Sequence, residues 1–213
     1  QNKKAWEYSA YKFWIDHSGP PSERAKKDIE NPLGMLKWHA NYFDSYTNIR
    51  IANICGSCGK KAIPLAILGA DVTVFDISED NRKYALEVAE AANVHIDYEV
   101  CDILDINLEK YGNYFDVVFM EGGILHYFHD INEFMSVMNS LLKPNGKMIC
   151  SDFHPFTKIA DTNGGFVTDC GKMENVTIYV GEAIYSNTNA FKLNTDSTTE
   201  MQTVKTAVSP NPF

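Results

Sequence analysis

Residues 49–76 constrain the fold of this chain more than any other stretch. A β-branched run that ends at Ile54 leads into Cys55-Gly-Ser-Cys-Gly59, five small residues at which a backbone can bend sharply and a ligand can approach closely. An apolar helix follows, and a second strand then ends on Asp76. This order of strand, tight turn, helix and acid-terminated strand is typical of a mononucleotide-binding half, in which the helix N-terminus and the acid contact the ligand.

Strands and helices continue to alternate after this unit. Residues 115–120 form an apolar run without alternation, which is typical of a central parallel strand covered on both faces. The further elements that we expect are helices over 79–93 and 131–142, strands over 95–100 and 147–153, and a turn over 142–146. Five strands that alternate with helices predict an α/β fold with a doubly wound parallel sheet.

An N-terminal segment, residues 1–48, is rich in aromatic side chains and predicts a helical cap. Helices are expected over 5–16, 22–29 and 33–46, with breaks at the prolines between them. Two compatible interpretations stay open. The cap buries its aromatic side chains on the edge of the sheet, or it forms a lid whose Tyr11 or Trp14 reaches a bound ligand.

Residues 49–213 are expected to form one α/β domain, and the chain is long enough for the core of such a domain. From about residue 161 the sequence becomes rich in Asn and Thr, and the tail over 161–213 is the part whose elements are hardest to assign. Short β-prone runs lie there at residues 176–180, 183–185 and 201–208.

The overall charge and hydropathy bear on the partners. A formal net charge of −9 argues against broad binding to the phosphate backbone of nucleic acids, which needs a basic face. No apolar run approaches the ~20 residues that span a bilayer, and the N-terminus has no apolar signal core. The chain lacks an initial Met, so we expect it to begin after a residue or tag that is not included. We therefore expect a small-molecule partner, no nucleic-acid or membrane partner, and a cytoplasmic location.

Cysteine usage supports that location. The five cysteines are an odd number in no framework spacing, which suits a reducing compartment. Cys55 and Cys58 form a C-x-x-C motif, which is interpreted as a redox pair, as half of a zinc site, or as small residues in a ligand-binding turn. Because no second C-x-x-C completes four sulfur ligands, the third interpretation is favoured.

Polar or small residues follow each of the five expected strands. The carboxyl ends of parallel strands share one edge of an open sheet, and ligands bind there at the point where the strand order reverses. The residues at these ends are Asn53 to Gly59, Asp76 to Ser78, Asp102 with Ile103, Glu121 to His126, and Asp152 with His154. They predict a ligand-binding rim, of a kind that any doubly wound enzyme shares.

The first of these strand ends resembles the first motif of class I S-adenosylmethionine-dependent methyltransferases, in which an acid and an apolar residue precede Gly-x-Gly-x-Gly. Asn53 falls on the acid position, and Cys55, Ser57 and Gly59 fall on the three glycines. The chain therefore departs from the family pattern at Asn53, Cys55 and Ser57. Cysteine and serine are small enough for the turn, and an Asn carbonyl can accept a hydrogen bond from the charged amino group of the cofactor.

Other stretches extend the resemblance over roughly residues 5–158. Residues 71–78 are similar to the second motif, whose acid binds ribose hydroxyls, and Cys101-Asp-Ile103 is similar to the third, whose acid meets the adenine amino group. Residues 115–128 are similar to the fourth motif. The sequences of residues 53–57, 122–128 and 151–155 together resemble a bacterial subgroup of small-molecule-type methyltransferases. The resemblance implies S-adenosylmethionine as cofactor and a Rossmann-like, mostly parallel sheet whose last strand is antiparallel. The residues that it assigns to the cofactor are Asn53, Cys55, Gly56, Ser57, Gly59, Asp76, Ile77, Ser78, Asp102, Ile103, Glu121, Gly122 and, from the cap, Tyr11.

Methyl transfer determines which other groups to look for. The protein mainly positions the two reactants and excludes water, and it needs a base only when the attacking atom must lose a proton. We predict His126 and His154 as candidates for that base, because they follow neighbouring strands; the alternative is that each is a structural histidine. A metal held by His126, His129, Asp152 and His154 is a less favoured interpretation, and no metal site is predicted.

The leading interpretation is thus a methyltransferase that acts on a small molecule. One alternative is a nicotinamide-dependent oxidoreductase, which shares the first strand–turn–helix–strand unit but does not predict Asp102 and Ile103. Another is a non-catalytic module that binds S-adenosylmethionine or senses redox state through Cys55 and Cys58.

Overall fold

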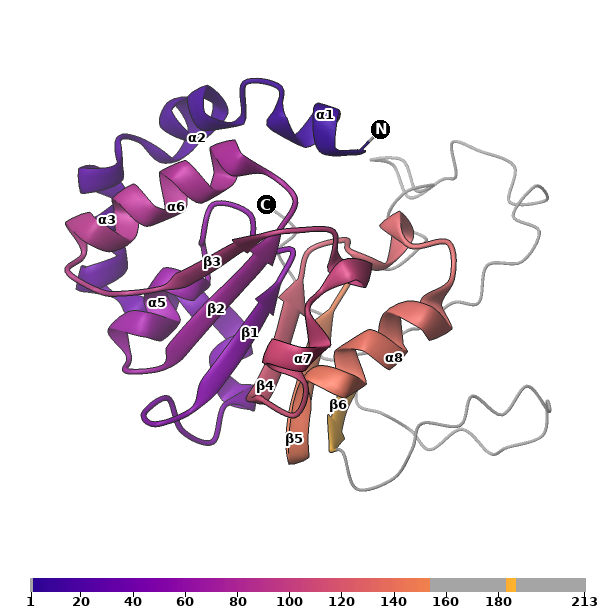
Figure 1. Cartoon of the computed structure of the whole chain (residues 1–213). Coiled ribbons are helices and arrows are strands. Elements are labelled where there is room, and N and C mark those ends of the chain that lie inside the picture. The colour runs from indigo at the N-terminus through magenta and orange to yellow at the C-terminus, as the bar shows by residue number, and fades with distance from the viewer. Residues whose placement is uncertain (1, 154–182, 187–213) are drawn as a thin grey trace, which may run out of the picture.

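A computed structural model describes residues 2–153 and 183–186 of the chain. Its centre is a six-stranded sheet in the order β3-β2-β1-β4-β5-β6, with helices on both faces (Figure 1). The strands are β1 (Arg50–Ile54), β2 (Asp71–Asp76), β3 (Asp97–Val100), β4 (Phe115–Glu121), β5 (Leu142–Ser151) and β6 (Ala183–Ser186).

The order of the strands confirms the doubly wound, mostly parallel sheet. β1 is central and pairs in parallel with β2 on one side and β4 on the other. The chain therefore reverses its direction of winding between β1 and β4, which is where ligands bind in open α/β sheets. β6 pairs antiparallel with β5, and it coincides with the β-prone run expected at residues 183–185. The runs at 176–180 and 201–208 lie outside the described residues.

The helices form one layer on each face of the sheet. The first layer contains α5 (Ala62–Ile67) and α6 (Glu79–Ala91), and the N-terminal segment packs outside them. The second layer contains η2 (Ile103–Asp105), α7 (Leu108–Tyr111), η3 (Leu125–Tyr127) and α8 (Ile131–Leu141). The apolar residues of the strands divide between two buried clusters, one under each layer.

The N-terminal segment differs in two ways from the expected helices. Its elements are α1 (Asn2–Glu7), α2 (Ala10–Ser18), α3 (Pro21–Glu30), α4 (Pro32–Leu36) and η1 (Lys37–Tyr42). The helix expected over 5–16 is broken at Ser9, and the one expected over 33–46 ends before Lys37, because both residues have a positive φ (55° and 56°) that an α-helix cannot contain.

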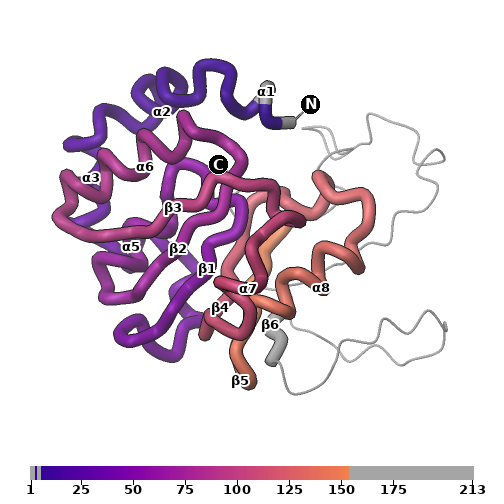
Figure 2. The backbone as a smooth tube through the Cα atoms, viewed as in Figure 1, coloured from indigo at the N-terminus to yellow at the C-terminus, as the bar shows by residue number. Residues whose placement is uncertain are grey.

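The position of the N-terminal segment corrects a second expectation. The aromatic side chains of α2 do not lie on the edge of the sheet, because α2 and α3 pack against α6, as the tube in Figure 2 also shows. The rings of Tyr11 and Trp14 contact the ring of Tyr84 on α6. α2 and α3 thus form an outer helical layer on one face of the sheet, whereas the rings of His39 and Phe43 contact Phe119 of β4 directly.

The last parallel strand begins earlier than expected. β5 starts at Leu142, whereas a turn was expected over 142–146 and a strand over 147–153. Leu142 pairs with Phe115, and the next pair is Lys147 with Val117, so an irregular segment interrupts the register. Asn145 adopts a left-handed φ of 66° within it. The expected chain reversal is therefore present as an irregularity inside the strand.

Within the described part of the chain, no helix combines the length and apolar character that a membrane span needs.

Candidate functional site

The turn after β1 keeps an unusual backbone conformation. Cys55, Ser57 and Gly59 have positive φ values of 49°, 48° and 74°. These are the three positions at which the methyltransferase motif has glycine, and an L-residue in this region costs roughly 1–2 kcal/mol. A Cβ atom added to Gly56 would lie 2.6 Å from Asn53 Oδ1, so only glycine fits between the strand and the turn. The turn of the motif therefore survives the loss of two glycines.

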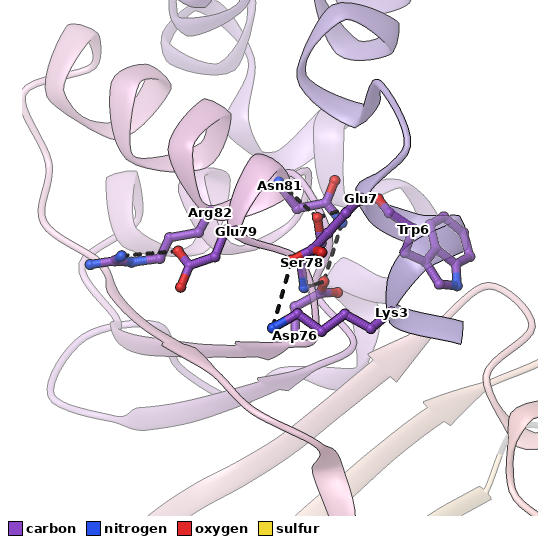
Figure 3. A network of polar contacts seen from close by, with 8 residues as sticks. All are labelled: Lys3, Trp6, Glu7, Asp76, Ser78, Glu79, Asn81 and Arg82. Carbon is purple, nitrogen blue, oxygen red and sulfur yellow. Dashed lines mark hydrogen bonds and ion pairs between the residues drawn. The ribbon is translucent and has the colours of Figure 1, made fainter. Parts of the chain in front are cut away.

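Asp76 at the end of β2 holds this turn in place. Its Oδ2 accepts a hydrogen bond from the Ser57 N–H at 3.0 Å. Its Oδ1 accepts from the Ser78 N–H at 3.0 Å and from Asn81 Nδ2 at 3.2 Å (Figure 3). Asp76 is 7% exposed, and burial raises the pKa of its carboxyl group. The Ser78 hydroxyl accepts from the Asn81 N–H and so caps α6.

The N-terminal segment reaches this network from outside. The Ser78 hydroxyl donates to the Trp6 carbonyl at 3.3 Å, and Trp14 Nε1 donates to Asn81 Oδ1 at 2.7 Å. Trp14 therefore acts on Asp76 through Asn81. Tyr11 is not brought together with the other predicted residues, because its hydroxyl bonds to Glu87 on the outer side of α6. Neither Asn81 nor its link to Trp14 was visible in the sequence.

The end of β3 supplies one exposed acid and one buried apolar side chain. Asp102 is exposed, and its Oδ1 accepts from the Leu104 N–H at 3.1 Å. Ile103 is 5% exposed. The Tyr98 hydroxyl of β3 donates to the Ser57 carbonyl at 2.7 Å, which joins this strand to the turn after β1. Asp102 keeps acceptor capacity for a ligand.

The end of β4 carries the predicted Glu121, beside two buried polar side chains that the sequence analysis missed. Glu121 lies 3.7 Å from Lys61 Nζ and 3.2 Å from His39 Nδ1. Lys61 and His39 are each 3% exposed, and they come from the start of α5 and from η1. Burial lowers the pKa of His39 to about 4, so that its ring is neutral at pH 7. Gly122 follows with a φ of 89° and open space beside its Cα.

The histidines predicted as bases are not brought together by the described residues. His126 is exposed on η3, and its ring lies 4.1 Å from that of Tyr127. His154 lies outside the described residues. Asp152 Oδ2 accepts from the Ile124 and Leu125 N–H groups at 2.8 and 2.7 Å, which joins the end of β5 to the loop after β4. Among residues 2–153 and 183–186, no group of three or more His, Cys, Asp or Glu side chains is arranged to hold a metal.

The two cysteines of the C-x-x-C motif point into different cores. Cys58 belongs to the cluster under α5 and α6, and Cys55 packs against the cluster under α7 and α8. Both thiols are unpaired. Burial raises the pKa of Cys58 to about 11 and raises that of Cys55 further. Reactive cysteines need an accessible thiolate, so a redox pair has no support here.

The comparison with protein families identifies this arrangement. Residues 54–150 match the family model of a methyltransferase domain. Residues 54–150 are therefore a methyltransferase domain, and they contain the motifs that resemble class I S-adenosylmethionine-dependent methyltransferases. The match confirms the resemblance drawn from the motifs, which implies S-adenosylmethionine as the cofactor. The oxidoreductase alternative finds no support.

Known proteins add detail to this match. The ubiquinone biosynthesis O-methyltransferase of Bordetella avium is 30% identical over 134 residues, which cover 62% of this chain and 53% of that protein. That of Roseobacter denitrificans is 35% identical over 109 residues, which cover 51% and 42%. The chain thus spans about half the length of the curated relatives that it matches.

A solved structure agrees on the fold. The magnesium protoporphyrin IX methyltransferase of Synechocystis, with S-adenosylhomocysteine bound, superposes with a TM-score of 0.52 at 16% identity over 70% of this chain and 69% of that one.

Proposed function

We propose that this chain transfers a methyl group from S-adenosylmethionine to a small-molecule acceptor. The observation that carries the proposal is the turn at Cys55, Ser57 and Gly59, which keeps three left-handed residues against the buried Asp76. Strained backbone persists only where the surrounding structure imposes it, and it gathers at ligand sites.

The residues present fit the cofactor. Asn53 Oδ1 is buried and, among the described residues, lacks a hydrogen-bond partner, and Gly122 has open space beside its Cα. Asp102 offers an exposed carboxylate at the next strand end. Asp76 already accepts from three donors, so it has room to accept little more than one ribose hydroxyl.

The chain's own residues mainly bind and orient. S-adenosylmethionine supplies an electrophilic methyl group on a sulfonium sulfur. In the proposed site Asp76 and Asp102 hold the nucleoside end, and the loop after β4 lies beside the reacting end. Holding both reactants in line and away from water accounts for most of the rate acceleration in such a reaction. If the attacking atom must lose a proton, His126 is the candidate base among the residues that the structure describes.

The relatives suggest the first acceptors to test. Two curated relatives are named as O-methyltransferases, so we infer that the attacking atom is an oxygen of a small organic molecule. A net charge of −9 favours such an acceptor over nucleic acid. The odd number of cysteines in the sequence supports a cytoplasmic site of action.

Calorimetric titration tests the proposal. We expect S-adenosylhomocysteine to bind with micromolar affinity, and NAD(H) and NADP(H) not to bind. Asp76→Ala should abolish binding, because it removes the support of the turn. Asp71→Ala at the other end of the same strand is the matched control and should leave binding unchanged.

Binding of a nicotinamide nucleotide instead of S-adenosylhomocysteine would refute the proposal. Urea unfolding of both variants separates loss of binding from loss of fold. A labelled-methyl assay with phenolic and carboxylic acceptors then tests the oxygen.

A further inference from the structure

Two buried polar atoms lack hydrogen-bond partners among the described residues, and both lie near Phe119 of β4. They are His39 Nε2 and Asn53 Oδ1. Asn53 Nδ2 donates to the Phe119 carbonyl at 3.4 Å, and the His39 ring lies 5.4 Å from the Phe119 ring. Their residues are each 3% exposed. Buried polar groups are nearly always paired, so two such atoms around one residue need an explanation.

Both atoms are hydrogen-bond acceptors. His39 Nδ1 faces two oxygens, the Leu36 carbonyl at 3.1 Å and Glu121 Oε2 at 3.2 Å. It must therefore carry the hydrogen, and in the neutral ring Nε2 is then a bare acceptor. The amide oxygen of Asn53 can only accept. This part of the molecule thus has acceptors to spare and needs a donor.

Glu121 adds an incompletely compensated negative charge. Its cationic neighbour Lys61 donates to the Met35 carbonyl at 2.7 Å and lies 3.7 Å from the carboxylate, beyond hydrogen-bond distance. The side chain of Glu121 is 27% exposed, so it is open to a ligand. Burial raises the pKa of the carboxyl group, although Lys61, Lys60 and Lys37 act to lower it.

The sheet places Glu121 next to Asn53 in the direction of the rim. Asn53 pairs with Phe119 in the parallel register of β1 and β4. Glu121 is two residues farther along β4, and side chains two apart on a strand share a face. The neutral Asn53 and the acidic Glu121 therefore emerge on the same face, with Glu121 closer to the carboxyl edge.

We propose that Glu121 supplies the negative charge that the chain lacks at Asn53, and that it binds the α-ammonium group of the cofactor's amino-acid end. Asn53 Oδ1 is the neutral second acceptor for the same group. His39 and Lys61 are positioning residues that hold the carboxylate toward the rim. This inference rests on the proposed function and assigns the recognition of one end of its cofactor.

A pair of ligands isolates the amino-acid end. S-adenosylhomocysteine carries the ammonium group, and 5′-methylthioadenosine shares the thioether and nucleoside but lacks the amino-acid moiety. Glu121→Gln keeps the size of the side chain and removes its charge. Glu90→Gln, at an exposed acid on α6, is the matched control. The wild-type protein and the two variants are each titrated by calorimetry with both ligands, after urea unfolding has shown that they are folded.

We expect Glu121→Gln to weaken S-adenosylhomocysteine by about tenfold or more, the size of a lost charge-assisted contact, and to leave 5′-methylthioadenosine unchanged. Glu90→Gln should change neither affinity. Unchanged binding of S-adenosylhomocysteine to Glu121→Gln overturns the inference alone, and so does an equal loss for both ligands. Wild-type protein that binds neither ligand overturns the proposed function as well.

His39→Asn tests the positioning role. Asn retains a donor near the place of Nδ1 and removes Nε2. We expect the affinity for S-adenosylhomocysteine to fall relative to the affinity for 5′-methylthioadenosine, because Glu121 is held less firmly toward the ammonium group. A variant that loses stability but keeps the wild-type ratio shows that His39 is only structural and overturns its part in the inference.

Discussion

At the scale of single residues, the turn after β1 shows what a glycine motif supplies. Cys55 and Ser57 take left-handed conformations that glycine would adopt without cost. Long-range contacts hold them there: Asp76 accepts from the Ser57 N–H, and the Tyr98 hydroxyl donates to the Ser57 carbonyl. The geometry of the motif is therefore encoded in its supports as well as in its own residues.

This argument predicts that Ser57→Gly stabilises the protein. Relief of the left-handed strain, roughly 1–2 kcal/mol, exceeds the entropic cost of glycine, roughly 0.5–1 kcal/mol. We expect the free energy of unfolding in urea to rise by about 0.5–1 kcal/mol. Ser45→Gly, in a loop and without a positive φ, is the control and should lower it slightly. Equal losses in the two variants would mean that the turn is not strained.

At the scale of elements, α6 connects the rim to the N-terminal segment. Its first turn presents Ser78 and Asn81 to Asp76, and α2 lies along its outer side. Asn81 is 1% exposed, and its amide uses both ends: Nδ2 donates to Asp76 and Oδ1 accepts from Trp14. The outer helical layer is thus two hydrogen bonds away from the predicted cofactor site.

Trp14→Phe tests this connection. The substitution removes the Nε1–H donor and leaves the buried Asn81 oxygen without it, which should lower the free energy of unfolding by roughly 1–3 kcal/mol. Trp38→Phe is the control, because the described contacts of Trp38 are with the rings of His39 and Tyr42. We expect a clearly smaller loss there. If urea titrations gave similar losses of unfolding free energy for the two variants, the loss in Trp14→Phe would come from the smaller ring and not from the missing hydrogen bond.

At the scale of the whole molecule, the N-terminal segment and the α/β domain share one core. Ala25 and Leu36 are at most 1% exposed, and they belong to the same buried cluster as Ile51 of β1 and Val88 of α6. A buried ion pair between Arg24 and Asp28 lies in the same outer layer. The packing of residues 1–48 is therefore continuous with the core of the α/β domain. Their role as a cap over a ligand stays a prediction.

Two leucines of α4 measure this shared core. Leu36 is fully buried and Leu33 is 49% exposed. We expect Leu36→Ala to lower the free energy of unfolding by about 2–4 kcal/mol, because it opens a cavity, and Leu33→Ala to change it by less than about 0.5 kcal/mol. Both variants should unfold in a single transition. A separate early transition in Leu36→Ala would show that the segment unfolds independently.

The sequence alone determined the parallel sheet, the residues at its strand ends and the resemblance to methyltransferases. These features depend on local signals: apolar runs, small-residue turns and an acid at the end of a strand are short-range patterns that one segment carries by itself. Asp76, Asp102 and Glu121 were assigned to the rim for this reason, and the structure places each at the end of its strand. Their roles toward the cofactor stay predictions.

Only the tertiary structure decided which side chains meet. His39, Lys61 and Glu121 come from η1, the start of α5 and the end of β4, and nothing local marks the first two as partners of the third. The sequence predicted Tyr11 as a lid residue, but in the packed structure its hydroxyl donates to Glu87. Contacts between residues far apart along the chain depend on how helices and sheet pack, and the periodicity of a segment does not contain that information.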